Sequence, residues 1–380
     1  MTAMSTTDKT TRPVDSLFRS LPWGSGELRN RIVMAPMTRN QSPGKIPAEN
    51  VAAYYRRRAE GGTGLIITEG TNTDHPASTA YPDVPAFYGT EALAGWKRVL
   101  DEVHAVGGTI IPQLWHCGSF RQTGMEPDPK LPGLGPSSVP HPFHEGKGEQ
   151  PREMSQVDID EAVGSYVRSA EFARELGFDG IELHGAHGYL IDQFFWEFTN
   201  HRTDRYGGSL ENRLNFGIEL VKAIRAAVGP NFPIVLRFSQ WKLGDYECKM
   251  LRDPNELECL LLPLVSAGVD VFHASTRHFN EPEFDGSDLN LAGWTKKITG
   301  KPTITVGSVG LDLELNETLQ GKETHHASLD HLLRRLDNQE FDLVAVGRAL
   351  LSDAAWANKV KEGREADIIP FNPQCLTELS

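Results

Sequence analysis

Cysteine is scarce in this sequence: the 380 residues include four, at positions 117, 248, 259 and 375. No two of them form a C-x-x-C pair, which argues against a zinc ribbon or an iron–sulfur cluster. Sparse cysteine in a chain of this size is typical of a protein in a reducing compartment. We therefore expect a cytoplasmic location.

Long apolar runs and excess positive charge are missing as well. No stretch approaches the ~20 apolar residues of a membrane-spanning helix, and residues 1–11 are polar, unlike a signal peptide. The formal net charge is −13. This charge argues against nucleic acid or an acidic membrane surface as the main partner.

What the sequence does contain is a regular alternation of short apolar runs and amphipathic helices. The apolar runs lie at residues 32–35, 64–68, 109–114, 180–183, 234–238, 269–272, 303–306 and 343–346. Each is nearly continuous in hydrophobicity, as a parallel strand covered on both faces is. Eight such units in one uninterrupted series predict an α/β fold, a (β/α)8 TIM barrel, in preference to an open doubly wound sheet.

Helical periodicity fills several of the gaps. The clearest helix begins at Ser155, has Asp158 in position for a capping box, and meets a stop signal at Gly177. The other predicted helices cover about 211–228, 91–106, 255–267 and 328–337.

Two long segments interrupt the alternation: residues 117–154 after the third strand and residues 276–294 after the sixth. Loops of this length are usually functional or disordered, and we expect both to cover the mouth of the barrel. No linker divides the chain, so residues 13–365 are predicted to form one domain. Residues 1–12 are expected to have no fixed structure and residues 366–380 to form a C-terminal tail.

Barrel enzymes carry their sites at the carboxyl ends of the strands. The turns after strands seven and eight contain glycines, and Arg348 follows the second, a pattern typical of a phosphate cradle. Gln113 and Arg237 end apolar strands and need polar partners there. A flat ligand with carbonyl and ring-nitrogen groups would satisfy both; the alternative for Arg237 is an ion pair with Glu69 or Glu182.

Two imidazoles and a phenol follow the fourth strand. His184 and His187 lack the helical H-E-x-x-H pattern of a zinc site, and none of the predicted strands contains a lysine, which argues against a Schiff-base aldolase. Together with Tyr189 they indicate an anion clamp beside a proton donor. A metal-dependent hydrolase or lyase that uses His184, His187 and His273 is the alternative enzyme.

These residues resemble the Old Yellow Enzyme family, the FMN-dependent ene-reductases that use NAD(P)H. The resemblance covers about residues 15–365. It rests on four motifs: Pro36-Met37-Thr38, His184-x-x-His187-Gly188-Tyr189-Leu190, Arg202-Thr203-Asp204-x-Tyr206-Gly207-Gly208-Ser209, and Gly347-Arg348.

The resemblance implies that FMN, bound tightly but non-covalently, lies across the barrel mouth and that NAD(P)H is the co-substrate. The implied cofactor contacts are Ala35, Pro36, Met37, Thr38, Gly70, Gln113, His184, Arg237, Gly307, Ser308, Gly347 and Arg348. Within this set, Thr38 would bond the flavin carbonyl near N5, Gln113 the pyrimidine edge, and Arg237 would face N1 and O2. The last four would hold the phosphate.

The resemblance also implies catalytic roles for His184, His187, Tyr189 and Thr38 in a monomer or homodimer. The two imidazoles would grip the carbonyl oxygen of an α,β-unsaturated substrate and stabilise its enolate-like charge. After a hydride from N5 reaches the β-carbon, Tyr189 would protonate the α-carbon, since a tyrosine of pKa about 10 is protonated at neutral pH. Many relatives have Asn in place of His187 and others have Cys in place of Thr38. A non-catalytic flavin binder is the remaining alternative.

Overall fold

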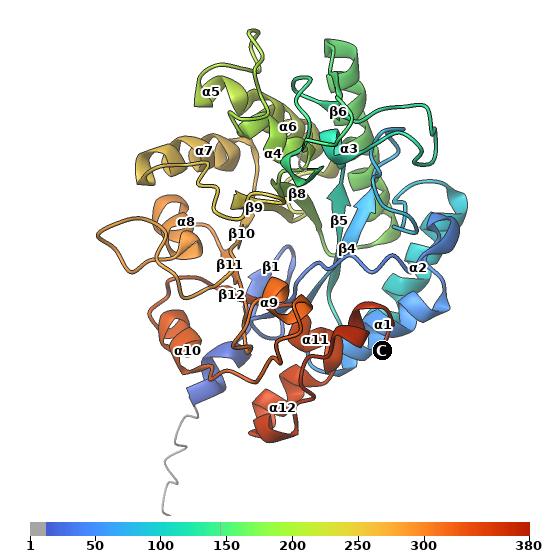
Figure 1. Cartoon of the computed structure of the whole chain (residues 1–380). Helices are drawn as coiled ribbons and strands as arrows, with labels where there is room; N and C mark the ends of the chain where they lie inside the picture. Colours follow the sequence, from blue (N-terminus) through green and yellow to red (C-terminus); the bar gives the residue numbers. More distant parts are fainter. Residues whose placement is uncertain (1–12, 145) are drawn as a thin grey trace, which may run out of the picture.

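Eight parallel strands close into a barrel in the computed structural model, which describes residues 13–144 and 146–380. The expected unstructured N-terminus, 1–12, lies outside the described residues. The barrel strands are β3 (Ile32–Met34), β4 (Leu65–Asn72), β5 (Ile110–Trp115), β8 (Ile181–His187), β9 (Ile234–Lys242), β10 (Val271–Ser275), β11 (Thr303–Val306) and β12 (Leu343–Val346). All eight predicted strands and the TIM barrel are confirmed (Figure 1).

Five strands, β4, β5, β8, β9 and β10, continue past their apolar runs. The registers of β4 with β5 and of β8 with β9 shift near these extensions, between Ile67 and Gly70 and between Gly185 and His187. Shifts of this kind re-aim side chains at a barrel rim. Because β9 extends to Lys242, the prediction that no strand contains a lysine is wrong. Lys242 is fully buried, however, and its Nζ pairs with Asp192 at 2.7 Å.

Helices surround the strands in Figure 1. The longer ones are α1 (Glu49–Glu60), α2 (Thr90–His104), α3 (Gln156–Leu176), α6 (Asn215–Val228), α7 (Pro254–Ala267), α8 (Leu291–Thr299), α10 (Asp330–Asp337) and α12 (Trp356–Glu362). The short ones are α4 (Leu190–Phe195), α5 (Leu210–Arg213), α9 (Leu315–Leu319) and α11 (Arg348–Ser352). No helix among the described residues is long and apolar enough to cross a membrane.

The helix predictions are confirmed in part. Ser155 and Asp158 form the capping box of α3, and Gly177 ends that helix with a φ of 94°. The helix expected over 211–228 is instead two, because a turn at Leu214 separates α5 from α6. Helix α1 was missed because the arginines 56–58 interrupt its apolar pattern.

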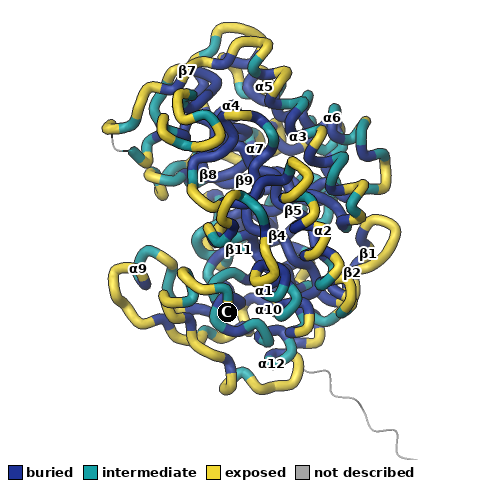
Figure 2. The backbone as a smooth tube through the Cα atoms, turned by 90° about the vertical axis from the view of Figure 1, so that its right-hand side faces the viewer, coloured by how far each residue is buried: buried dark blue, intermediate teal, exposed yellow. Residues whose placement is uncertain are grey.

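A short hairpin lies under the barrel. Strands β1 (Leu21–Trp23) and β2 (Gly26–Leu28) pair in antiparallel fashion, and Leu21, Trp23 and Leu28 join the cluster of interior side chains from the barrel strands. The Trp23 indole donates to the carbonyl of Asp179, just before β8 begins. The hairpin therefore covers the amino-terminal end of the barrel, and the dark blue buried core in Figure 2 runs through the strands.

The two predicted cover segments differ in structure. Residues 117–154 contain β6 (Leu134–Gly135) and β7 (Arg152–Glu153), which pair with each other. Buried Arg121 fixes this segment by donating to main-chain carbonyls, among them those of Thr79 and Asp128. The second segment leads from β10 into α8, which begins at Leu291.

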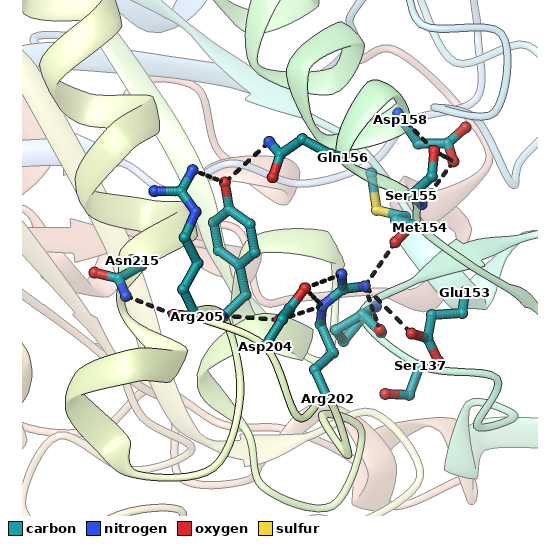
Figure 3. A network of polar contacts seen from close by, with 12 residues as sticks. Ser137, Glu153, Met154, Ser155, Gln156, Asp158, Arg202, Asp204, Arg205 and Asn215 are labelled. Atoms are coloured by element: carbon teal, nitrogen blue, oxygen red, sulfur yellow. Dashed lines mark hydrogen bonds and ion pairs between the residues drawn. The ribbon is translucent and has the colours of Figure 1, made fainter.

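The Arg202-to-Ser209 motif is an anchor between loops (Figure 3). The Arg202 guanidinium is buried and donates to the carbonyls of Met154 at 2.6 Å and Pro136 at 3.1 Å. Tyr206 donates its hydroxyl to Glu219 of α6 at 2.8 Å. At Gly207 an added Cβ would lie 2.1 Å from the Arg202 carbonyl oxygen, so the turn accepts only glycine. The motif ties the loop after β8 to the long segment after β5.

We predict that Arg202→Ala lowers the free energy of unfolding by about 2–3 kcal/mol, because it leaves buried carbonyls without charged donors. Arg205→Ala is the matched control. Its side chain is 58% exposed and pairs with Glu219, so its loss should cost at most about 1 kcal/mol. Urea unfolding of the three proteins measures both changes. Equal losses in the two variants would show that Arg202 is not the anchor.

Candidate active site

A cavity of about 330 Å³ opens at the carboxyl ends of the barrel strands. The predicted site residues that line it are Ala35, Pro36, Met37, Thr38, Gln113, His184, His187, Tyr189, Arg237, Gly307, Ser308, Gly347 and Arg348. They come from six different parts of the sequence. The barrel brings together nearly the whole predicted set.

Gly70 is the predicted site residue that does not line the cavity. It lies against the indole of Trp115, where an added Cβ would come within 2.3 Å of Trp115 Cε3. Gly70 therefore lets Trp115 occupy the cavity wall. Its main-chain contact with a flat ligand stays a prediction.

A buried carboxylate lies beneath the cavity. Glu182 of β8 accepts from Gln113 Nε2 and from His273 Nδ1, each at 2.7 Å. The three side chains are almost completely buried. The bond from its amide nitrogen leaves the side-chain oxygen of Gln113 as an acceptor without a partner among the described residues.

Arg237 faces the cavity without a carboxylate partner. Within the described part of the chain it makes no ion pair with Glu69 or Glu182, so the alternative raised from the sequence is wrong. Its Nη2 donates to Ser275 Oγ at 3.2 Å, and its buried Nε has no hydrogen-bond partner in the described ranges 13–144 and 146–380. Burial lowers the pKa of Arg237, and nearby Glu182 opposes that shift. A ligand acceptor would complete the hydrogen bonding of this guanidinium.

The two imidazoles and the phenol pack edge to face. The ring centroids of His184 and His187 are 5.0 Å apart, and those of His184 and Tyr189 are 4.9 Å apart. His187 has a positive φ of 64°, and Ser239 Oγ accepts from its backbone amide at 2.9 Å. Its ring stacks on Trp241 with centroids 4.2 Å apart. The register shift in β8 thus places both imidazoles on the cavity.

Burial sets the protonation of this group. It places the pKa values of His184 and His187 well below the usual 6.5, and the positive charge of Arg237 lowers them further. Burial raises the pKa of Tyr189 well above 10, and its hydroxyl lies 2.9 Å from that of Tyr81. At neutral pH the cavity therefore presents neutral imidazoles beside a protonated phenol.

The turns after β11 and β12 meet at the other end of the cavity. Arg348 donates from Nη2 to Ser308 Oγ at 3.3 Å and from Nη1 to Thr318 Oγ1 at 3.2 Å. Gly307 has a φ of 144°, and a Cβ there would lie 2.8 Å from the Phe279 amide nitrogen. Burial and nearby Arg277 lower the pKa of Arg348 to about 10. Two guanidinium groups thus gather beside narrow turns, an arrangement that suits an anion.

Sequence reasoning missed several cavity residues. Arg277 pairs with Glu314 at 2.8 Å, and its guanidinium lies 4.5 Å from the Tyr246 ring centroid. Ser275 ends β10, three residues past the apolar run, and Arg277 follows two residues later. A prediction that continued this strand beyond its apolar run would have pointed to both residues. Glu314 lies in a loop with no periodic pattern, as does Tyr81, which contacts the Tyr189 hydroxyl but does not itself line the cavity. The sequence held no signal for either position.

The metal alternative has no support in the structure. His273 is buried against Glu182 and does not line the cavity. In the part of the chain that the structure describes, no group of three or more His, Cys, Asp or Glu side chains is placed to hold a metal ion.

Comparison with known proteins supports the resemblance. A family model described as NADH:flavin oxidoreductase / NADH oxidase family matches residues 16–367. An NADH oxidase from Thermoanaerobacter brockii is 36% identical over 374 residues, which are 95% of this chain and 53% of that protein. The chain thus spans about half the length of that relative. A putative 12-oxophytodienoate reductase-like protein 1 from Arabidopsis thaliana is 35% identical over 293 residues, 72% of this chain and 88% of that protein.

A solved structure has the same architecture. Morphinone reductase in complex with tetrahydroNAD superimposes with a TM-score of 0.78 and 29% identity, covering 95% of this chain and 93% of that one.

We predict that His184 and His187 do not titrate near pH 6.5, since burial and Arg237 disfavour the imidazolium. His104 is the internal control, because its bond to Asp179 raises its pKa above 6.5. NMR of ¹³C-labelled imidazoles as a function of pH should show His104 titrating on the alkaline side of 6.5 and the other two neutral throughout. A midpoint at or above 6.5 for either cavity histidine would contradict the burial argument.

Proposed function

Because the chain belongs to the NADH:flavin oxidoreductase / NADH oxidase family, which includes the Old Yellow Enzymes, we propose that it reduces activated carbon–carbon double bonds with NAD(P)H and FMN. The observation that carries the proposal is one cavity with two unlike ends. Arg348 and the glycine turns form a cationic end, and His184, His187 and Tyr189 form a neutral, proton-donating end. A phosphate-bearing redox cofactor and a carbonyl substrate need these two environments.

The residues present fit FMN. Arg348, Ser308 and the turn at Gly307 would hold the phosphate, and Arg237 has a buried Nε that lacks an acceptor. Gln113 offers a free carbonyl oxygen to a ring N–H. Thr38 lines the same cavity with its hydroxyl unbonded among the described residues, and we propose that it donates to the ring. FMN, when bound, supplies the hydride that reaches the β-carbon of the substrate.

The chain's own residues then act on the substrate. His184 and His187 hold its carbonyl oxygen by neutral N–H donors and stabilise negative charge that develops there. The Nδ1 of His184 is buried and has no hydrogen-bond partner in the described part of the chain, whereas His187 Nε2 lies 2.8 Å from Ser275 Oγ. Ser275 thereby fixes which way the His187 ring turns.

Tyr189 supplies the proton. It stays protonated at neutral pH because its pKa is raised by burial, and it lies edge-on to His184. We propose that it protonates the α-carbon while Tyr81 keeps the phenol oriented through the 2.9 Å hydroxyl contact.

The substrate class follows from the clamp. Two donors that converge on one oxygen select an α,β-unsaturated carbonyl compound such as an enone. Relatives named for reducing 12-oxophytodienoate and morphinone, both carbonyl compounds by name, support this class. The scarcity of cysteine and the net charge of −13 support a cytoplasmic enzyme with small-molecule partners. We propose that it acts as a monomer or homodimer.

We predict that Tyr189→Phe slows reoxidation of the reduced enzyme by an enone about 100-fold or more, because it removes the general acid. Flavin reduction by NAD(P)H should be unchanged within about twofold, since no proton passes from Tyr189 in that step. Stopped-flow absorbance separates the two half-reactions.

Tyr246→Phe is the matched control for this variant. Tyr246 lies near the mouth against Trp241 and Arg277, and the substitution keeps its ring, so both rates should match the unaltered enzyme. Equal slowing of both half-reactions by Tyr189→Phe would remove it from the proton-donor role. A flavin that NAD(P)H does not reduce would overturn the proposed function itself.

A further inference from the structure

The turn at residues 36–40 places Thr38 on the cavity. No described residue bonds the Thr38 hydroxyl, so its direction depends on how firmly the backbone of the turn is held. Asn40 has a positive φ of 54°. Asn adopts this conformation more readily than most non-glycine residues. Two buried charged residues hold the turn.

Glu69 of β4 holds the turn through its carboxylate. Its Oε2 accepts from the backbone amide of Arg39 at 2.8 Å, and the amide of Asn40 also stabilises the carboxylate. Glu69 is itself fixed, because its backbone amide donates to Tyr55 Oη at 2.8 Å. Burial raises the pKa of this carboxyl to about 7, and no described residue forms a hydrogen bond with its Oε1. An ionisable group kept in so costly a position is characteristic of a functional site.

Arg39 ties the same turn to the C-terminal segment. Its side chain is buried, and its Nη2 donates to the carbonyls of Cys375 at 2.6 Å and Glu378 at 2.7 Å. Arg57 of α1 also binds this segment, through the carbonyl of Leu379 at 2.6 Å. In Figure 1 the red C-terminal segment lies beside α1. The predicted C-terminal tail is therefore docked next to the cavity wall.

We infer that Glu69 and Arg39 are positioning residues for Thr38, and that residues 375–379 help Arg39 to hold the turn that carries Thr38. The inference rests on the proposed function, in which the Thr38 hydroxyl faces the flavin. Glu69 grips the backbone on one side of the turn, while Arg39 ties its other side to the C-terminal segment. A hydrogen bond weakens steeply as its donor moves. Loosening either hold therefore weakens the bond that Thr38 makes, and the reduction potential of the bound flavin reports that bond.

The test compares reduction potentials of the FMN-loaded enzyme and its variants. Thr38→Ala sets the size and sign of the shift when the hydroxyl is absent. Arg39→Met removes the donors but keeps the length of the side chain, and Glu69→Gln keeps the shape but removes the charge. Each should shift the potential in the direction of Thr38→Ala by at least half as much. In the double variants that also carry Thr38→Ala, the potential should equal that of Thr38→Ala alone.

Arg56→Ala is the control, since Arg56 lies on α1, pairs with Glu60 and Glu102, and contacts neither the turn nor the C-terminal segment; its potential should match that of the unaltered enzyme. Unchanged potentials in both Arg39→Met and Glu69→Gln would overturn the inference. So would shifts that add to that of Thr38→Ala, because additivity means that only charge acting through space has changed. If Arg39→Met does not fold, the isosteric Glu69→Gln still decides the question. Failure of the unaltered protein to bind FMN would instead reject the proposed function.

Discussion

The buried carboxylate of Glu182 is the interaction on which the cavity depends. It joins three strands of the barrel by accepting from Gln113 of β5 and His273 of β10. Its charge also opposes the loss of the proton from Arg237, whose guanidinium is buried and forms no ion pair with any residue that the structure describes. Arg237 in turn helps to keep both cavity imidazoles neutral. Removing the partner of a buried charge is strongly destabilising. Loss of the Glu182 carboxylate would therefore disturb both the packing beneath the cavity and the protonation of the groups that line it.

From this floor the cavity extends toward two different environments. At one end, guanidinium groups approach turns that have no room for a Cβ at Gly307, so backbone and cation face the same space. At the other end, burial leaves uncharged donors around His184 and Tyr189. The closed barrel explains the juxtaposition, because all eight strands deliver their carboxyl ends to one rim. A cofactor that spans the rim places its charged tail and its reactive ring in matching surroundings.

Much of this arrangement could be predicted from the sequence. Continuous apolar runs marked the strands because parallel barrel strands are buried on both faces, and strand ends such as Gln113 and Arg237 then had to converge. The runs could not show where strands end once polar residues begin, so Ser275 and Lys242 were left outside them. Pairings between distant loops, such as Tyr81 with Tyr189, leave no local pattern. The capped α3 was predictable because its signals are local, whereas α1 was hidden by its arginines.

The motifs that carry the family resemblance have different physical roles. Gly347-Arg348 and the His184–Tyr189 run face the cavity, but the run that begins at Arg202 holds loops together at a distance from it. A segment can therefore mark a family through the framework that it stabilises. Thr38 shows the intermediate case, since its own side chain faces the cavity while Glu69 and Arg39 hold its backbone.

Bound FMN would lie across the rim with its ring opposite the paired imidazoles. An absorption spectrum of the purified protein, titrated with FMN and then with a phenol, is the decisive measurement. We expect a yellow protein and a new long-wavelength charge-transfer band as the phenol oxygen enters the imidazole clamp above the ring. A colourless protein whose spectrum of added FMN is the same as that of free FMN would contradict this expectation.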